Sequence, residues 1–137
     1  MEPRVTAVTL AAPDVASTVD FYRRAFGWDP AFINDEVAFF DLGGMVLSLW
    51  SGLGDELGHE LPPAGAMALA HNVRAAEEVD RVIDEAVSEG ATVAAPARRQ
   101  DWGGYSGMIA DPNGHLWEIA YNPDWPLDAE GRVRLPR

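Results

Sequence analysis

Asp41–Trp50 has the sequence DLGGMVLSLW, and a similar stretch, DPNGHLWEIA, follows at Asp111–Ala120. A constant offset of 70 residues places aspartate on aspartate, glycine on glycine and apolar residues on apolar residues. Each copy predicts a turn followed by a strand, because Gly-Gly and Asn-Gly pairs are typical of tight turns. Ser48 of the first copy stands where the second copy has Glu118. We therefore expect one structural unit to occur twice, with a carboxylate at this position only in the second unit.

The residues around the first copy predict a βαβββ order. A β-rich run at 5–11 precedes Asp14, which can cap a helix, and apolar residues then recur at helical spacing as far as Gly27, a stop signal. The remaining strands of this half are expected at about 30–33, 36–42 and 45–50.

The second half repeats this order. A strand is expected at 67–73, and an amphipathic helix with acidic residues in its first turn should end at Gly90. Further strands are expected near 92–98, 105–110 and 115–121. The predicted fold class is α+β, with two paired βαβββ modules that form curved mixed sheets around a central cavity and helices on the outside. The predicted parts of this single domain are module 1 at about 1–51, a linker at 52–66, module 2 at 67–123 and a C-terminal tail at 124–137.

Composition restricts the classes of partner. The chain has 137 residues, a net charge of −12 and no cysteine. Nucleic acid is not expected as a partner, because phosphate binding depends on clustered basic residues. Apolar runs are too short to span a membrane, and the absence of thiols fits a cytoplasmic location. The negative charge favours either a cationic small molecule as ligand or simple solubility.

Two segments resemble a known family. VTAVTLAAPDVASTVDFYRRAFGW at 5–28 and DPNGHLWEIAYNP at 111–123 are similar to the first strand and helix and to the last strand of the vicinal oxygen chelate superfamily. This superfamily includes glyoxalase I, extradiol dioxygenases, and fosfomycin- and bleomycin-resistance proteins. The resemblance implies the paired βαβββ fold, and it implies a homodimer, which the exposed edge strands of such a small fold also favour. It does not fix the reaction, because one fold hosts several functions.

The resemblance also implies where a metal would bind. In metal-dependent members, one ligand comes from the first strand and one from the last strand of each module. The matching positions here are Ala7, Ser48, Ala68 and Glu118. A divalent ion prefers imidazole nitrogen or carboxylate oxygen, usually from three or more residues. We therefore expect no metal and no other cofactor.

The three histidines are not expected to replace these ligands. His71 is predicted on the side of its strand that faces the helix, and His115 is predicted to support the turn after Asp111. His59 lies in the linker and would reach a pocket only if that loop folded over it.

Glu118 has two interpretations from sequence. Its carboxylate is either held structurally by neighbours such as Ser48 or Thr9, or it faces a ligand as a general acid or base or as the partner of a cation. Because no partner base or metal is predicted beside it, binding is the preferred functional interpretation.

Aromatic residues near the predicted pocket support binding, because such rings stack on flat ligands and on cations. The predicted function is a metal-free small-molecule-binding protein, of the bleomycin-resistance kind, that sequesters an aromatic or cationic drug-like compound. The predicted ligand-binding residues are Phe39, Ser48, Trp50, Trp102, Tyr105 and Glu118, whereas Trp28 and Trp117 are expected in the core.

Two other classes stay open. One is an enzyme of the same superfamily, of lyase, isomerase or dioxygenase type, that uses Glu118 as an acid or base or as a metal ligand. The other is an interaction module without a small ligand, in which side chains would fill the cavity.

Overall fold

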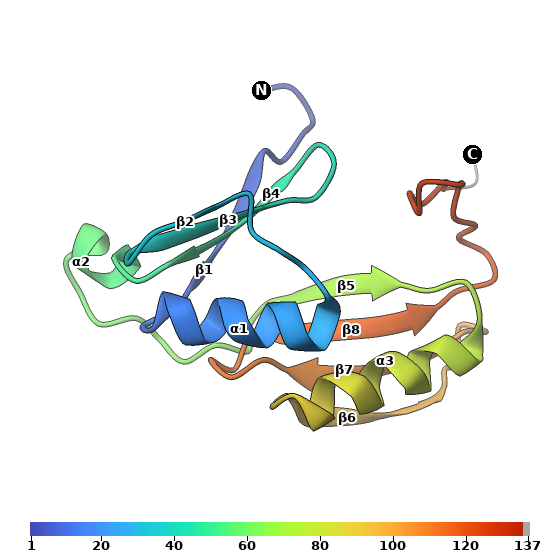
Figure 1. Cartoon of the computed structure of the whole chain (residues 1–137). Helices are drawn as coiled ribbons and strands as arrows, with labels where there is room; N and C mark the ends of the chain where they lie inside the picture. Colours follow the sequence, from blue (N-terminus) through green and yellow to red (C-terminus); the bar gives the residue numbers. More distant parts are fainter. Residues whose placement is uncertain (136–137) are drawn as a thin grey trace. The chain divides into compact units, whose positions relative to one another are not determined.

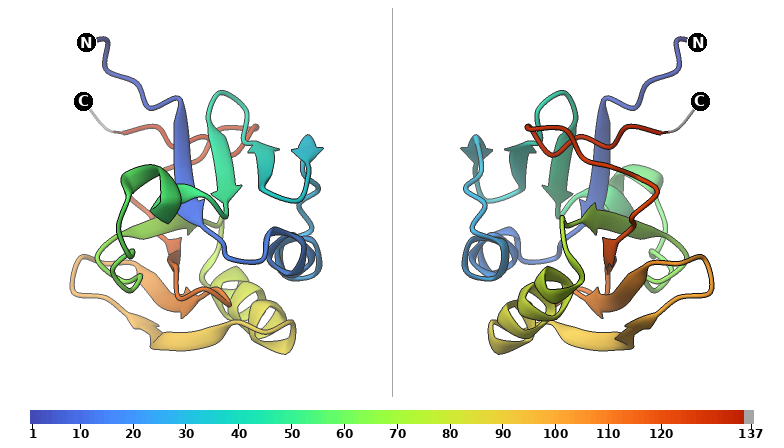
Figure 2. Two further views of the ribbon diagram at one scale, coloured as in Figure 1. Left: turned by 90° about the vertical axis from the view of Figure 1, so that its left-hand side faces the viewer. Right: turned by 90° about the vertical axis from the view of Figure 1, so that its right-hand side faces the viewer.

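The structure, a computed structural model, describes residues 1–135 and divides into two compact units, Met1–Ala64 (unit 1) and Gly65–Arg137 (unit 2). Each unit has a four-stranded mixed sheet with a helix against one face (Figures 1 and 2). Within the described residues, no helix is long and apolar enough to cross a membrane.

Unit 1 has the predicted βαβββ order. Helix α1 spans Val15–Phe26, and the sheet has the strand order β1-β4-β3-β2. Its strands are β1 (Ala7–Ala11), β2 (Phe32–Ile33), β3 (Val37–Asp41) and β4 (Val46–Trp50). Strand β1 pairs with β4 in parallel, whereas the other neighbours are antiparallel.

Local sequence explains where α1 begins and ends. The Asp14 side chain accepts a hydrogen bond of 3.0 Å from the amide of Ser17, and Gly27 closes the helix in the left-handed conformation with φ of 71°. The buried face of α1 carries Phe21 and Tyr22, which pack edge to face. Trp28 stacks on Tyr22 but is only half-buried, so it lies at the edge of the core in which it was predicted.

Unit 2 repeats the order with α3 (Ala76–Ser88) and the strand order β5-β8-β7-β6. Its strands are β5 (Ala68–Asn72), β6 (Thr92–Arg99), β7 (Tyr105–Ala110) and β8 (Leu116–Tyr121). Val79, Ile83 and Ala86 form the buried face of α3. Trp117, predicted in the core, is buried at 4% exposure.

The register of the two parallel pairs confirms the internal repeat. Thr9 lies opposite Ser48 across β1 and β4, and Ala70 lies opposite Glu118 across β5 and β8. The turns correspond as well, because Asp41 and Asp111 each accept a side-chain hydrogen bond of 2.9 Å from the amide two residues further on.

Two segments differ from the sequence prediction. The linker, expected to be irregular, contains a one-turn helix, α2 (Leu53–Leu57), that ends at Gly58 with φ of 73°. The C-terminal tail, for which no structure was predicted, forms a short hairpin with a bridge between Leu127 and Val133. The hairpin has no hydrophobic periodicity in its sequence, so a pattern of apolar residues could not reveal it.

Candidate functional site

Glu118 lies in the middle of β8, on the face of the second sheet that does not carry α3. It lies opposite Ala70 on one side and Met108 on the other, so these three side chains share a face. Gly107 belongs to the opposite face, where an added Cβ would be 2.8 Å from the Ile83 Cδ1 atom of α3. The Glu118 side chain is therefore on the face of the sheet away from α3.

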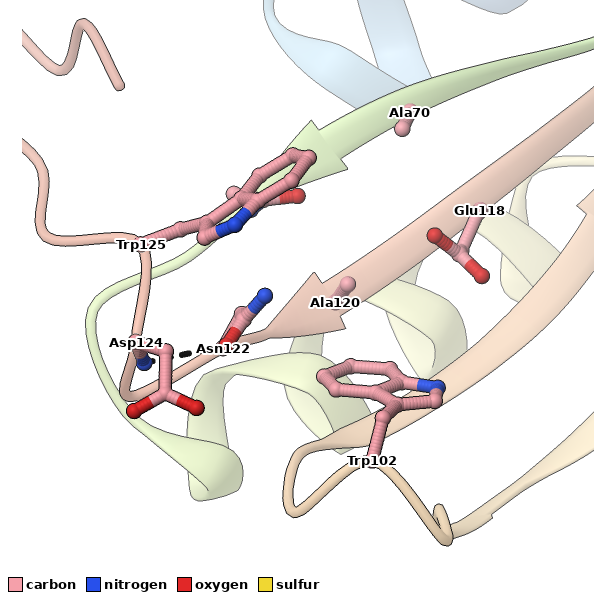
Figure 3. A pocket seen from close by; sticks show the side chains of 8 residues that line it. Ala70, Trp102, Glu118, Ala120, Asn122, Asp124 and Trp125 are labelled. Atoms are coloured by element: carbon pink, nitrogen blue, oxygen red, sulfur yellow. Dashed lines mark hydrogen bonds between the residues drawn. The ribbon is translucent and has the colours of Figure 1, made fainter. Parts of the chain in front are cut away.

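A pocket of about 450 Å³ opens on this helix-free face, entirely within unit 2 (Figure 3). Its volume lies in the range of small-molecule sites, about 300 to 1,000 Å³. The residues that line it are Ala70, Asn72, Trp102, Glu118, Ala120, Asn122, Asp124 and Trp125. Ala70 and Ala120 have small side chains, which leaves room above the sheet between the larger ones.

Trp102 reaches the pocket from the tight turn between β6 and β7. The turn is held by hydrogen bonds from Gly103 N to Gln100 O (3.0 Å) and from Gln100 N to Gly104 O (2.9 Å). The Gln100 side chain also donates a 3.0 Å hydrogen bond to the Ser106 hydroxyl on β7. These contacts fix the base of the turn, while the indole itself stays 47% exposed.

Trp125 reaches the pocket from the segment that follows β8. The Asn122 side-chain oxygen accepts a 3.0 Å hydrogen bond from Asp124 N. The backbone carbonyl oxygen of Asn122 accepts a 3.1 Å hydrogen bond from Trp125 N. This turn brings the second indole back over the sheet. Figure 3 shows the indoles of Trp102 and Trp125 on two sides of Ala120, with Glu118 further along the strand.

The charge of the pocket comes from two carboxylates. Glu118 and Asp124 line it, and among residues 1–135 no Arg or His does. Within the described part of unit 2, the Glu118 carboxylate has no hydrogen-bonding or ion-pair partner. The site can therefore offer hydrogen-bond acceptors and negative charge to a ligand placed between two indoles.

Of the six predicted ligand-binding residues, the structure brings Trp102 and Glu118 together. Tyr105 is on the α3 face of the sheet, where its hydroxyl donates a 2.8 Å hydrogen bond to Asp80. This hydrogen bond raises the pKa of the Tyr105 hydroxyl. The strand alternation explains the difference, since Tyr105 is three residues from Met108, which shares the face of Glu118.

The other three predicted residues belong to unit 1. Phe39 lies opposite Ser48 across β3 and β4, on the face of the first sheet away from α1. Ser48 is buried at 5% exposure, and Phe39 stacks on Phe32 with ring centroids 5.7 Å apart. Trp50 packs over Gly52, where an added Cβ would be 2.7 Å from the indole nitrogen. Their part in ligand binding stays a prediction.

Sequence reasoning missed Asn72, Asn122, Asp124 and Trp125 as pocket residues. Asn72 could have been found from strand parity, because it follows Ala68 and Ala70 on the same face of β5. The other three follow the last strand, in the sequence NPDW at 122–125. A tryptophan directly after an Asn-Pro turn was the available signal that the chain folds back there.

The histidines lie outside the pocket. His71 shares the α3 face with Ile119. Burial lowers the pKa of His71, and the nearby Glu78 charge opposes this shift only in part. The amide of His115 donates a 2.9 Å hydrogen bond to Asp111, in the turn that His115 was predicted to support. The His59 ring is 2.9 Å from the carbonyl oxygen of Glu60 in the segment after α2.

The sequence matches the model of a known protein family. The model of the Glyoxalase/Bleomycin resistance protein/Dioxygenase superfamily matches residues 4–119, so the chain belongs to this superfamily. Two modules with the same strand order and the same register are the fold expected of a vicinal oxygen chelate protein.

Solved structures and a curated relative agree with this assignment. A glyoxalase-related enzyme from Fulvimarina pelagi is 40% identical, with a TM-score of 0.91 over 98% of this chain and 99% of that chain. The lactoylglutathione lyase of Agrobacterium tumefaciens is 22% identical, with a TM-score of 0.68 over 88% and 94% of the two chains, and indicates the fold alone. Phenazine antibiotic resistance protein EhpR of Enterobacter agglomerans is 28% identical over 84% of this chain and 85% of its own length.

The donor atoms at the family's metal positions do not fit a divalent ion. The four positions identified from sequence are Ala7, Ser48, Ala68 and Glu118, of which Glu118 alone carries a carboxylate and none carries an imidazole. Within residues 1–135, no group of three or more His, Asp or Glu side chains could hold a metal ion.

Proposed function

We propose that the protein binds a small planar organic molecule that carries a positive charge or several hydrogen-bond donors, and that it acts by sequestering this molecule. The observation that carries the proposal is the pocket of unit 2, in which two indoles and a carboxylate without a partner among residues 1–135 face the same space of about 450 Å³. An interaction module without a ligand is less well supported, because the described side chains of unit 2 do not fill this space.

The two indoles support a flat ligand. Trp102 and Trp125 are 47% and 44% exposed, although burying such rings in a core would be favourable. A planar aromatic molecule that covered both would remove apolar surface from water and gain stacking contacts. A positive charge on that molecule would add a cation–π attraction of about 0.5 to 2 kcal/mol.

The carboxylates support a ligand with cationic or donor groups. Glu118 and Asp124 line the pocket, and the described part of the chain places no basic residue in its lining. A protonated amine would give them a charged partner, and charge-assisted hydrogen bonds are among the stronger ones. The relative from Enterobacter agglomerans, named for resistance to a phenazine antibiotic, is consistent with this class of ligand.

A titration with planar dyes tests the proposal. Proflavine, a flat tricyclic cation, should quench tryptophan emission in a saturable way, with a stoichiometry of one per chain. Trp102→Ala should weaken this binding about tenfold or more, because the loss of an aromatic anchor costs about 2 kcal/mol or above at many sites. Trp28→Phe, a change in the aromatic core of unit 1, is the matched control and should bind as the wild type does.

Saturable binding that is the same in wild type, Trp102→Ala and Trp28→Phe would reject this pocket as the site. Absence of binding across a panel of planar cations and neutral heterocycles, including a phenazine, would reject the proposed function.

A second candidate is catalysis by Glu118 on a small metabolite. Two observations favour it: the Glu118 carboxylate has no partner within the described part of unit 2, and the relative at 40% identity is described as a glyoxalase-related enzyme. In this case the carboxylate would take or return a proton at a bound substrate, as a general base or acid.

We also propose that two chains associate as a homodimer. Each sheet has two edge strands within its own unit, β1 and β2 in unit 1 and β5 and β6 in unit 2. Edge strands expose backbone groups that need cover. Light scattering at several concentrations tests the proposal, and a monomeric mass at every concentration would reject it.

A further inference from the structure

One arginine side chain donates hydrogen bonds from the body of unit 2 to the C-terminal hairpin at 126–134. Among the described residues, every hydrogen bond that joins this hairpin to the body of the unit comes from Arg74. Its guanidinium donates to the carbonyl oxygen of Asp128 at 2.7 Å and to that of Leu127 at 3.4 Å. Arg74 stands two residues after the end of β5, so it connects the first strand of the unit with the last segment of the chain.

The hairpin is internally well connected. Asp128 N donates to Arg132 O and Arg134 N donates to Pro126 O, each at 2.9 Å. The Asp128 carboxylate accepts from Arg132 N at 2.9 Å and from the Arg134 guanidinium at 2.8 Å. The hairpin should therefore move as one piece, and its attachment through Arg74 should decide where that piece lies.

Trp125 directly precedes this hairpin and lines two pockets. The second pocket, of about 240 Å³, is lined in part by Arg74 and Leu127, and it shares Trp125 and Asn122 with the candidate site. A shift of Trp125 would therefore change both pockets. Its position depends on the segment that Arg74 holds. Pro126 adds to this dependence, because it restricts the backbone of the residue before it.

We propose that Arg74 is a positioning residue for ligand selection: by holding the hairpin, it fixes Trp125 as the end wall of the candidate site and so limits the length of the ligand. The inference rests on the proposed function, since it concerns the same site. Without Arg74, the wall would be free to shift toward the smaller pocket. The site would then lose its preformed stacking surface but would admit longer molecules.

Two planar cations of different size test the inference. Proflavine has a compact ring system, whereas ethidium carries an additional phenyl ring. Wild type should prefer proflavine. Arg74→Met should weaken proflavine binding about tenfold, because the second indole must be ordered again on binding. It should leave ethidium binding within about twofold of wild type, because the displaced wall makes room for the phenyl ring.

The controls separate a local effect from a general one. Arg81→Met also removes one guanidinium from unit 2, at an exposed position where Arg81 pairs with Glu85, and should bind both dyes as wild type does. Arg74→Lys keeps the charge but lacks the fork of donors, so it should restore part of the preference for proflavine. Amide hydrogen exchange gives a readout independent of any ligand. Arg74→Met should accelerate exchange at Trp125, whose amide donates to Asn122 O outside the hairpin, and should leave Arg134, whose amide donates to Pro126 O within the hairpin, close to wild type.

Each outcome bears on one proposal or the other. If Arg74→Met binds both dyes as wild type does, or weakens both equally, Arg74 does not select for size, although the site itself stands. If exchange at Trp125 is unchanged, Arg74 does not hold the hairpin, whatever the binding result. Wild type that binds neither dye would reject the candidate site for planar cations, and with it the role of Arg74 in ligand selection. Faster exchange at Trp125 in Arg74→Met would still show that Arg74 holds the hairpin.

Discussion

The indole of Trp102 lies so close to the backbone of Gly104 that a Cβ atom on residue 104 would overlap the ring. The same atom would be 2.5 Å from the carbonyl oxygen of Tyr121 on the neighbouring strand. The indole is thus pressed onto backbone that carries no side chain, and this contact supports one side of a half-exposed ring at the pocket. Gly104 is needed here for space, as a close approach of a ring to the chain requires.

Gly104→Ala should therefore displace Trp102. Either the ring leaves the pocket or the turn shifts away from β8, and overpacking of this kind costs about 1 to 3 kcal/mol of unfolding free energy. Proflavine affinity should fall about as far as in Trp102→Ala. Gly54→Ala, in α2, is the matched control, because its Cβ would be 3.4 Å or more from the nearest atoms, which belong to His59 and Leu61. Wild-type affinity in Gly104→Ala would show that the ring position does not matter for binding.

Much of the fold could be predicted because local signals and the repeat agree. Helix α1 begins directly after Asp14 and ends directly before Gly27, as the capping side chain of Asp14 and the backbone freedom of Gly27 predict. The 70-residue offset aligned Ser48 with Glu118, and the two stand at equivalent register positions opposite Thr9 and Ala70. A repeat constrains both copies at once. The alignment of the two copies therefore predicted the register correctly, whereas the register of a single strand would have been ambiguous.

The candidate site could be predicted only in part, because it depends on contacts between distant residues. Trp125 becomes a wall of the pocket through a hairpin held by Arg74, whose bond to Asp128 spans 54 residues. No periodicity in the tail reveals such a contact. Tyr105 was predicted to bind the ligand, but the pairing of Met108 with Glu118 puts Tyr105 on the opposite face of β7.

Asp14→Ala should lower the free energy of unfolding of unit 1 by about 1 kcal/mol, because it removes the side-chain acceptor at the start of α1. Urea denaturation measured with a probe in unit 1, such as Trp28 emission, checks the value. Asp14→Asn keeps an acceptor for the Ser17 amide and should retain most of the stability. Equal losses in both variants would mean that the charge near the helix terminus, rather than the cap, is responsible.

The hairpin should also respond to acid. Hydrogen bonds from Arg132 N and from the Arg134 side chain lower the pKa of Asp128 below its usual 3.8. A carboxyl group with a lowered pKa stabilises the folded state above its unfolded pKa, and this contribution is lost as pH falls through the lower, folded pKa. Protection of the Arg132 amide should therefore be constant between about pH 7 and pH 5 and should fall below about pH 3.8.

Asp128→Asn is the control for this acid response. It keeps an acceptor at the same position but cannot titrate, so the additional loss of protection in acid should disappear. A wild-type hairpin that opens near about pH 6 would contradict the assignment to Asp128, because a lowered carboxyl pKa cannot act in that range.

Glu118→Gln distinguishes sequestration from catalysis. The substitution keeps the shape of the side chain and one acceptor oxygen but removes the charge and the ability to take a proton. For a binder of planar cations, affinity for proflavine should fall several-fold, on the order of 1 kcal/mol, while a neutral planar ligand should bind about as tightly as before. Asp124→Asn, which removes the other carboxylate of the lining, shows how much of the loss reflects the general charge of the pocket. If, instead, wild type turns over a bound metabolite and Glu118→Gln retains affinity while turnover falls by a factor of about 100 or more, Glu118 acts as the acid or base, and simple sequestration is rejected.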